Sequence, residues 1–217
     1  MTDDLSPARA ALVRGAHHVA TMLADPAVAA AWSTPSALAT WPVSTLAGHL
    51  ASQVLNPRQK LQPRGVDPDR PAIPLVQHYQ QVAWIGADPE TGPNVGIRAF
   101  SDDFAAPGPT ALAAQVQAEV PLLEQWLRAA PADAVVDPPW NGWAVTLDSF
   151  ATTRLVEISF HADDLAVSLG LPTTTPDEVT APVLALLVQL SAARHGASAV
   201  LRTFGRTERA PATIATF

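Results

Sequence analysis

The sequence of 217 residues contains no cysteine. The absence of thiol groups excludes disulfides, a cysteine nucleophile and thiolate metal sites. A metal ion in this protein therefore has to be bound by nitrogen and oxygen. A thiol that takes part in its chemistry has to arrive as a cosubstrate.

The sequence is also poor in positive charge and in long hydrophobic runs. Its 13 Lys and Arg against 20 Asp and Glu give a formal net charge of −7, which argues against nucleic acid as a partner because phosphate binding requires clustered basic residues. No apolar run approaches the roughly 18–20 residues of a membrane-spanning helix, so we expect no membrane partner. The N-terminal residues lack the basic and apolar regions of a signal peptide, so we expect a cytoplasmic protein.

Apolar residues make up 48% of the chain and charged residues 15%, which predicts a globular protein with a large core. Ala-rich segments with helical periodicity and frequent proline boundaries predict an all-α or mainly α fold. We expect helices over residues 6–31, 44–60, 75–85, 110–130, 147–169 and 177–195, with Ser44 as the N-cap of the second. The Pro-, Gly- and Asp-containing stretch 86–109 is expected to be an irregular loop that covers the functional site.

The helix expected around residues 154–170 carries a polar set on one face. Glu157, His161 and Asp164 are spaced i, i+4 and i+7, so their side chains project within roughly 60° of one another. Two groups one turn apart can bind a single metal ion. The alternative is a carboxylate–imidazole hydrogen bond on a solvated face. Asp164 also has a second interpretation, as a surface carboxylate.

His49 lies in an otherwise apolar helix, in the segment TWPVSTLAGHLASQV. An imidazole among core residues must find a partner, because an unpaired buried polar group costs a few kcal/mol. Such a histidine is often a hydrogen-bonded core residue. Here, however, another helix carries a Glu/His pair that lacks a third ligand.

Two segments together resemble a known family. The Trp-Pro-x3-Leu-x2-His-Leu segment that contains His49 and the Thr-Arg-Leu-Val-Glu-x3-His-x2-Asp-Leu segment are similar to those of the DinB-like metal-dependent superfamily. Within it they most resemble the N-terminal domain of mycothiol-dependent maleylpyruvate isomerases. The resemblance implies a four-helix bundle over residues 1–171, with an extra C-terminal helix and short tail over residues 172–217.

The resemblance also implies a site and a chemistry. His49, Glu157 and His161 would bind one divalent metal, most often zinc with nickel as an alternative, and the metal would activate a small, mycothiol-like thiol cosubstrate. The expected reaction is S-transfer to, or isomerisation of, a small electrophile. Asp164 would orient His161 or act as a base. Arg202 is the candidate anion contact after the bundle, with Arg206 and Arg209 close by in the sequence. Arginines at a helix end can instead donate hydrogen bonds to its free carbonyl groups.

Three other interpretations remain at the level of sequence. A metal-containing bundle can bind a small molecule without turnover, or it can hydrolyse a substrate with metal-bound water. In the third, the bundle holds no metal and the three side chains only hydrogen-bond to one another. The expected partners are therefore a small substrate and a thiol, and the chain is either a monomer or a homodimer.

Overall fold

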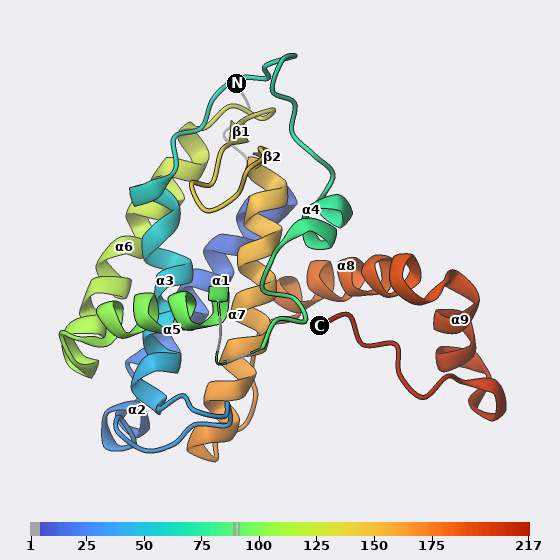
Figure 1. Ribbon diagram of the computed structural model, residues 1–217. Helices are drawn as coiled ribbons and strands as arrows, with labels where there is room; N and C mark the ends of the chain where they lie inside the picture. The colour runs from blue at the N-terminus through green and yellow to red at the C-terminus, as the bar shows by residue number, and fades with distance from the viewer. Residues whose placement is uncertain (1–4, 89, 91) are drawn as a thin grey trace.

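Four long helices form the core of the computed structural model, which describes residues 5–88, 90 and 92–217. They are α1 (Pro7–Leu23), α3 (Val43–Lys60), α6 (Pro109–Ala129) and α7 (Leu147–Leu169). Helices α1 and α3 each pack against both α6 and α7, so the four close a bundle (Figure 1). The apolar stripes of these helices supply most of the largest fully buried side chains, among them Leu12, Leu46, Leu50, Leu112, Leu123, Leu155 and Ile158. The predicted mainly α bundle is confirmed.

The helix expected to carry the site is α7. It begins after Thr146, whose side chain accepts a hydrogen bond from the Ser149 N–H, and it ends at Gly170 in the left-handed conformation with φ of 65°. Glycine reaches this conformation without the steric cost of a Cβ. These bounds match the sequence prediction, so the 3.6-residue periodicity placed the polar face of α7 correctly.

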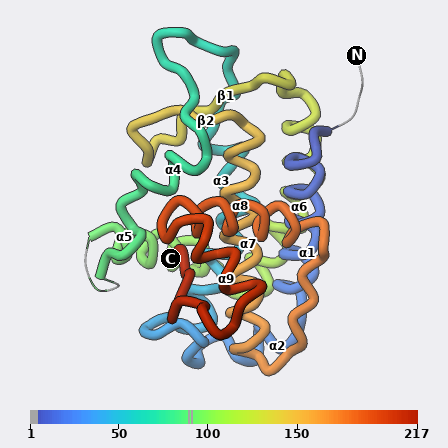
Figure 2. Tube along the Cα trace, turned by 90° about the vertical axis from the view of Figure 1, so that its right-hand side faces the viewer, coloured from blue at the N-terminus to red at the C-terminus, as the bar shows by residue number. Residues whose placement is uncertain are grey.

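The C-terminal part of the chain forms an arm beside the bundle. Helix α8 (Asp177–His195) packs against α7 and α1, and it is followed by α9 (Ala197–Gly205) and the short helix η1 (Thr207–Arg209). Figures 1 and 2 show α9 at the end of α8 and the last residues returning toward the bundle. The returning segment is tied to α8, because Ser191 donates to the Ile214 carbonyl at 2.9 Å and Arg194 to the Thr216 carbonyl at 2.9 Å.

Three predicted helix boundaries were wrong. The helix expected over residues 6–31 stops at Leu23, because the Asp25 side chain accepts from the Ala27 N–H and caps a separate α2 (Pro26–Ala30). Ser44 is not a cap, since α3 begins at Val43 without a side-chain cap. Helix α4 (Leu75–Gln81) is shorter than the expected 75–85.

The stretch 86–109 is not an irregular loop as expected, because it contains α5 (Gly92–Ala105). This helix packs mainly on α3. The close approach is made at Gly48, where an added Cβ would lie 2.1 Å from the Ser101 carbonyl oxygen. Sequence pattern missed α5 because glycines at 92 and 96 lower its helix propensity, whereas its contact with α3 is a tertiary effect.

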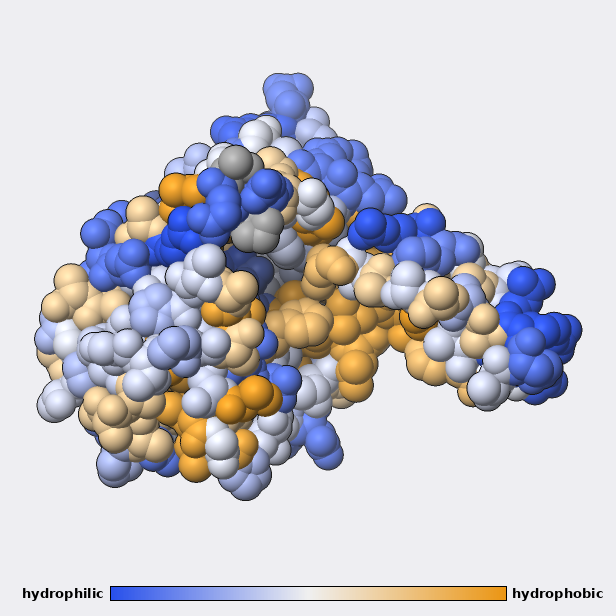
Figure 3. Space-filling view, turned by 60° about the horizontal axis from the view of Figure 1, so that its bottom comes forward, coloured by the Kyte–Doolittle hydropathy of each residue, from blue (hydrophilic) through white to orange (hydrophobic). Residues whose placement is uncertain are grey.

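The remaining regular structure is a small antiparallel pair, β1 (Val135–Val136) and β2 (Val145–Thr146), at the start of α7. Among the described helices, none combines the length and the apolar character that crossing a bilayer requires. Hydrophobic surface gathers instead in the hollow between the bundle and the α8–α9 arm (Figure 3). Exposed apolar side chains of the arm include Leu184, Val188, Leu201 and Phe204.

Candidate metal centre

Helices α3 and α7 bring three side chains to one point inside the bundle. His49 comes from α3, and Glu157 and His161 lie one turn apart on α7. One oxygen of the carboxylate, Glu157 Oε2, is 3.2 Å from His49 Nε2 and 3.4 Å from His161 Nε2. The three atoms all lie within 4.8 Å of one another, a spacing that suits ligands of a single metal ion.

The other ring nitrogen of His49 is held by α5. The Ser101 hydroxyl donates its only proton to the Ile97 carbonyl at 2.7 Å, so its oxygen accepts from the Nδ1–H of His49 at 3.1 Å. In the neutral imidazole the proton therefore sits on Nδ1, and Nε2 presents a lone pair to the site.

His161 is oriented in the same way by its own helix. Its Nδ1–H donates to Asp164 Oδ2 at 3.0 Å, which directs Nε2 toward Glu157. A metal-binding histidine usually donates its second ring N–H to a carboxylate or another fixed acceptor. In both imidazoles Nδ1 is thus bonded to an acceptor and Nε2 is directed toward Glu157, which is the orientation of Nε2 metal ligands.

The electrostatics of the cluster favour a bound cation. Burial alone would raise the pKa of Glu157, but the close approach of the His161 and His49 rings outweighs it and holds that pKa well below its usual value. Burial lowers the pKa of His49, which keeps its ring neutral. Burial also acts to lower the pKa of His161, but hydrogen bonds to Asp164 and Glu157 raise it to about 9. A buried carboxylate stays charged here by attracting positive charge.

The comparison with protein families agrees with this geometry. Residues 12–166 match the family described as "Mycothiol maleylpyruvate isomerase N-terminal domain". The chain belongs to this family. The match spans α1 through most of α7, and thus includes His49, Glu157 and His161. Neither curated proteins nor solved structures gave a match to the chain.

Membership of the mycothiol maleylpyruvate isomerase family confirms the resemblance seen in the sequence and associates the chain with thiol-dependent enzymes. The binding of a metal by the three side chains, and its identity, stay predictions. So does a catalytic role for Asp164. Arg202 is exposed on α9, and within the part of the chain that the structure describes no hydrogen bond or ion pair joins it to the cluster. Its predicted role in substrate binding is likewise a prediction.

Aromatic side chains surround the site unequally. Trp41, from the Trp-Pro motif, packs edge-on against His49 with 5.6 Å between ring centroids. Of the two tryptophans that shortly precede α7, Trp143 donates from its indole N–H to His78 Nδ1 at 3.0 Å, whereas the Trp140 side chain is exposed. Burial and then the charge of Arg154 lower the pKa of His78 to about 4, so this ring is a neutral acceptor.

Sequence reasoning missed four residues beside the site. Ser101 fell in the expected loop, and Gln53, Tyr79 and Arg154 were not singled out. Gln53 donates to the His49 carbonyl at 2.9 Å and accepts from Arg154 Nη1 at 2.6 Å. Arg154 precedes Glu157 by three residues on the same helix, so the i, i+3 spacing alone would have found it.

Proposed function

We propose that this chain is a metal-dependent enzyme that uses a small thiol, such as mycothiol. The enzyme would either join the thiol through its sulfur to a small electrophile or isomerise that electrophile. The observation that carries the proposal is the convergence of His49 Nε2, His161 Nε2 and Glu157 Oε2, with each imidazole fixed by a hydrogen bond from its Nδ1–H. Family membership supports the thiol as cosubstrate.

The residues present fit a divalent metal of the zinc type. Two imidazole nitrogens and one carboxylate oxygen are the donor set of catalytic zinc sites, which keep a further position open for water or substrate. A metal would displace the Nε2 proton of His161. The cluster is buried enough that Glu157 would otherwise be a poorly solvated charge: its side chain is 17% exposed. A bound metal of this type lowers the pKa of a thiol so that it reacts as the thiolate.

The protein side chains then have distinct tasks. His49, Glu157 and His161 would hold the metal, while Ser101 and Asp164 orient the two imidazoles from behind. Asp164 can also accept a proton near the site, since its carboxylate is partly exposed with a side-chain exposure of 27%. Trp41 covers the His49 ring and limits access of water.

A thiol panel tests the proposal directly. Zinc-loaded protein would be assayed with mycothiol, glutathione and cysteine, using maleylpyruvate for isomerisation and 1-chloro-2,4-dinitrobenzene for S-transfer. We expect turnover that requires both thiol and metal and that is lost in His161→Ala but kept in His17→Ala, whose side chain lies on the exposed face of α1.

Other outcomes would contradict the proposal in identifiable ways. Turnover of an ester or amide without thiol would indicate a hydrolase. Tight binding of a small molecule by metal-loaded protein, with no turnover of either substrate, would indicate a binding protein.

A further inference from the structure

The guanidinium of Arg154 lies beside the three-ligand cluster with much of its hydrogen-bonding capacity unused. Its Nη1 donates to Gln53 Oε1 at 2.6 Å, its Nε donates to Thr153 Oγ1 at 3.2 Å, and its carbon lies 5.0 Å from the centre of the Phe150 ring. A guanidinium has five N–H donors. Among the described residues no carboxylate forms an ion pair with Arg154, although burial is strong enough to lower its pKa.

Tyr79 of α4 presents a second unused donor to the same place. Its side chain is buried, with 5% of the residue exposed, and its hydroxyl has no hydrogen-bond partner among the described residues. Burial raises the pKa of this phenol, so it remains a neutral donor, and the charges of Glu157 and Arg154 both act on it. Phe217 contacts the rings of both Tyr79 and Phe160, which places Tyr79 beside α7, the helix that carries Arg154 and Glu157.

We propose that Arg154 and Tyr79 form a carboxylate-recognition subsite beside the metal centre. The inference rests on the proposed function, because the carboxylate would belong to the electrophile or, where the cosubstrate is a carboxylate-bearing thiol such as glutathione, to that thiol. A planar guanidinium binds a carboxylate through two parallel hydrogen bonds, and the Tyr79 hydroxyl adds a third donor. The Tyr79 hydroxyl otherwise remains a buried polar group without a partner among the described residues, which is costly in a folded protein.

Gln53 connects this subsite to the metal centre. Its side-chain oxygen accepts from Arg154, while its side-chain nitrogen donates to the carbonyl of His49. The guanidinium is thereby held on the side of α7 that also carries Glu157, one turn further on. A ligand with its carboxylate on Arg154 would place the rest of the molecule at the cluster.

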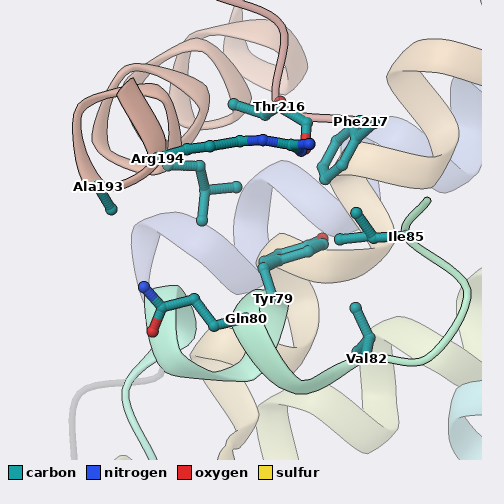
Figure 4. Close-up of a pocket in the computed structure, with 9 residues that line it drawn as sticks. Tyr79, Gln80, Val82, Ile85, Ala193, Arg194, Thr216 and Phe217 are labelled. Carbon is teal, nitrogen blue, oxygen red and sulfur yellow. The ribbon is translucent and has the colours of Figure 1, made fainter. Parts of the chain in front are cut away.

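The outer side of the subsite is covered by aromatic rings. Phe217 packs against Tyr79 and Phe160 with centroid distances of 5.6 and 5.8 Å, and against Trp84 at 5.4 Å. A pocket of about 310 Å³ opens next to these rings between α4 and α8 (Figure 4). Because the Tyr79 hydroxyl is shielded, a ligand reaches it by displacing one of the rings. Phe217 belongs to the C-terminal segment, whose backbone carbonyls at residues 214–216 accept hydrogen bonds from side chains of α8.

Calorimetric binding of two ligand pairs tests the subsite. The first pair, 3-mercaptopropionate and 3-mercaptopropionamide, differs only in the charge of a thiol-bearing ligand. The second pair, maleate and dimethyl maleate, makes the same comparison for an electrophile without thiol. Each would be titrated into zinc-loaded wild type, Arg154→Gln, Tyr79→Phe and the surface control Arg14→Gln, with zinc content measured for every sample.

We expect wild type and Arg14→Gln to bind the charged member of one pair roughly 10-fold or more tightly than the neutral member. Arg154→Gln should abolish that preference, and Tyr79→Phe should reduce it severalfold. Preference within the thiol pair assigns the carboxylate to the cosubstrate, and preference within the maleate pair assigns it to the electrophile. A purely structural Tyr79 would show no change in binding, because Tyr79→Phe removes only an unpaired oxygen.

The inference is overturned if wild type shows no charge preference in either pair, or if the preference is unchanged in Arg154→Gln and Tyr79→Phe. Failure of the proposed function has a different signature. In that case the protein would hold no zinc, yet the maleate pair would still report the charge preference on metal-free protein. Loss of the subsite alone would instead leave the zinc content unaltered.

Discussion

Ser101 determines which nitrogen of His49 is available to a metal. Because its hydroxyl proton is committed to the Ile97 carbonyl, it can only accept from the imidazole Nδ1–H. Asp164 does the same for His161. Both histidines of the candidate metal site are thus oriented by an acceptor outside the proposed ligand set: the Ser101 hydroxyl for His49 and the Asp164 carboxylate for His161.

Replacing Ser101 with alanine should weaken metal binding without removing a ligand. Loss of the acceptor frees the His49 ring to rotate or change tautomer, and we expect zinc affinity to fall by about 10- to 100-fold. The measurement is competition against a zinc chelator of known affinity. Ser159→Ala is the matched control, because the buried Ser159 hydroxyl on α7 has no partner among the described residues, and the affinity of this variant for zinc should equal that of wild type. Equal affinities in both variants would show that Ser101 does not position His49.

At the scale of elements, the crossing of α3 and α5 places Ser101 against His49. The two helices approach each other at Gly48, and Thr45 donates a hydrogen bond to Asp102 on the same interface. Helix α5 therefore supports His49 of the candidate metal site from the side of its ring opposite Glu157.

Gly48→Ala should disturb stability and metal binding together. The added Cβ would meet the Ser101 carbonyl at 2.1 Å, and backbone cannot yield as a flexible side chain would. We expect a loss of about 1–3 kcal/mol in the free energy of urea unfolding and a zinc affinity reduced with it, since α5 carries Ser101. Gly96 lies on α5, where an added Cβ would have no atom of the described residues within 4 Å. Gly96→Ala should therefore keep zinc affinity and raise the free energy of unfolding by up to about 1 kcal/mol. If Gly48→Ala behaves like Gly96→Ala, the close packing of α3 on α5 is not what holds the site.

Sequence periodicity predicted the helices whose own residues show a helical pattern of apolar and polar positions. Glu157 and His161 were placed together because both lie on one long helix, where spacing fixes the face. His49 was found because an imidazole stood in an apolar run. Ser101 and Tyr79 escaped notice because only tertiary packing of α5 and α4 brings them to the site. The Pro- and Gly-rich sequence around α5 gave no helical pattern.

At the scale of the whole molecule, Arg9 joins three of the four bundle helices. It lies on α1 with 4% exposed, forms an ion pair with Asp148 at the start of α7 at 2.7 Å, and donates to carbonyls at the end of α6. These carbonyls belong to Leu127, Ala130, Pro131 and Ala132. One buried cation thus satisfies a helix C-terminus and fixes the position of another helix.

Arg9→Met should destabilise the bundle by about 3 kcal/mol, because it leaves Asp148 and the α6 carbonyls without their donor. Urea unfolding monitored by tryptophan fluorescence measures the loss. Arg14→Met is the control, since the Arg14 side chain is 61% exposed and only 3.7 Å from Glu178 in a surface ion pair. Such a pair contributes at most about 1 kcal/mol. A similar small effect in both variants would show that Arg9 does not anchor the bundle.

The central claim is that the bundle holds one metal ion between α3 and α7. Elemental analysis of untagged protein, prepared without chelator and dialysed against zinc, tests it most directly in wild type, His49→Ala, His161→Ala and the control His17→Ala. We expect about one equivalent of divalent metal in wild type and His17→Ala, and its loss in the other two variants. Metal-free wild type, or equal metal content in all four proteins, would contradict the account and leave the cluster as a set of hydrogen bonds in the core.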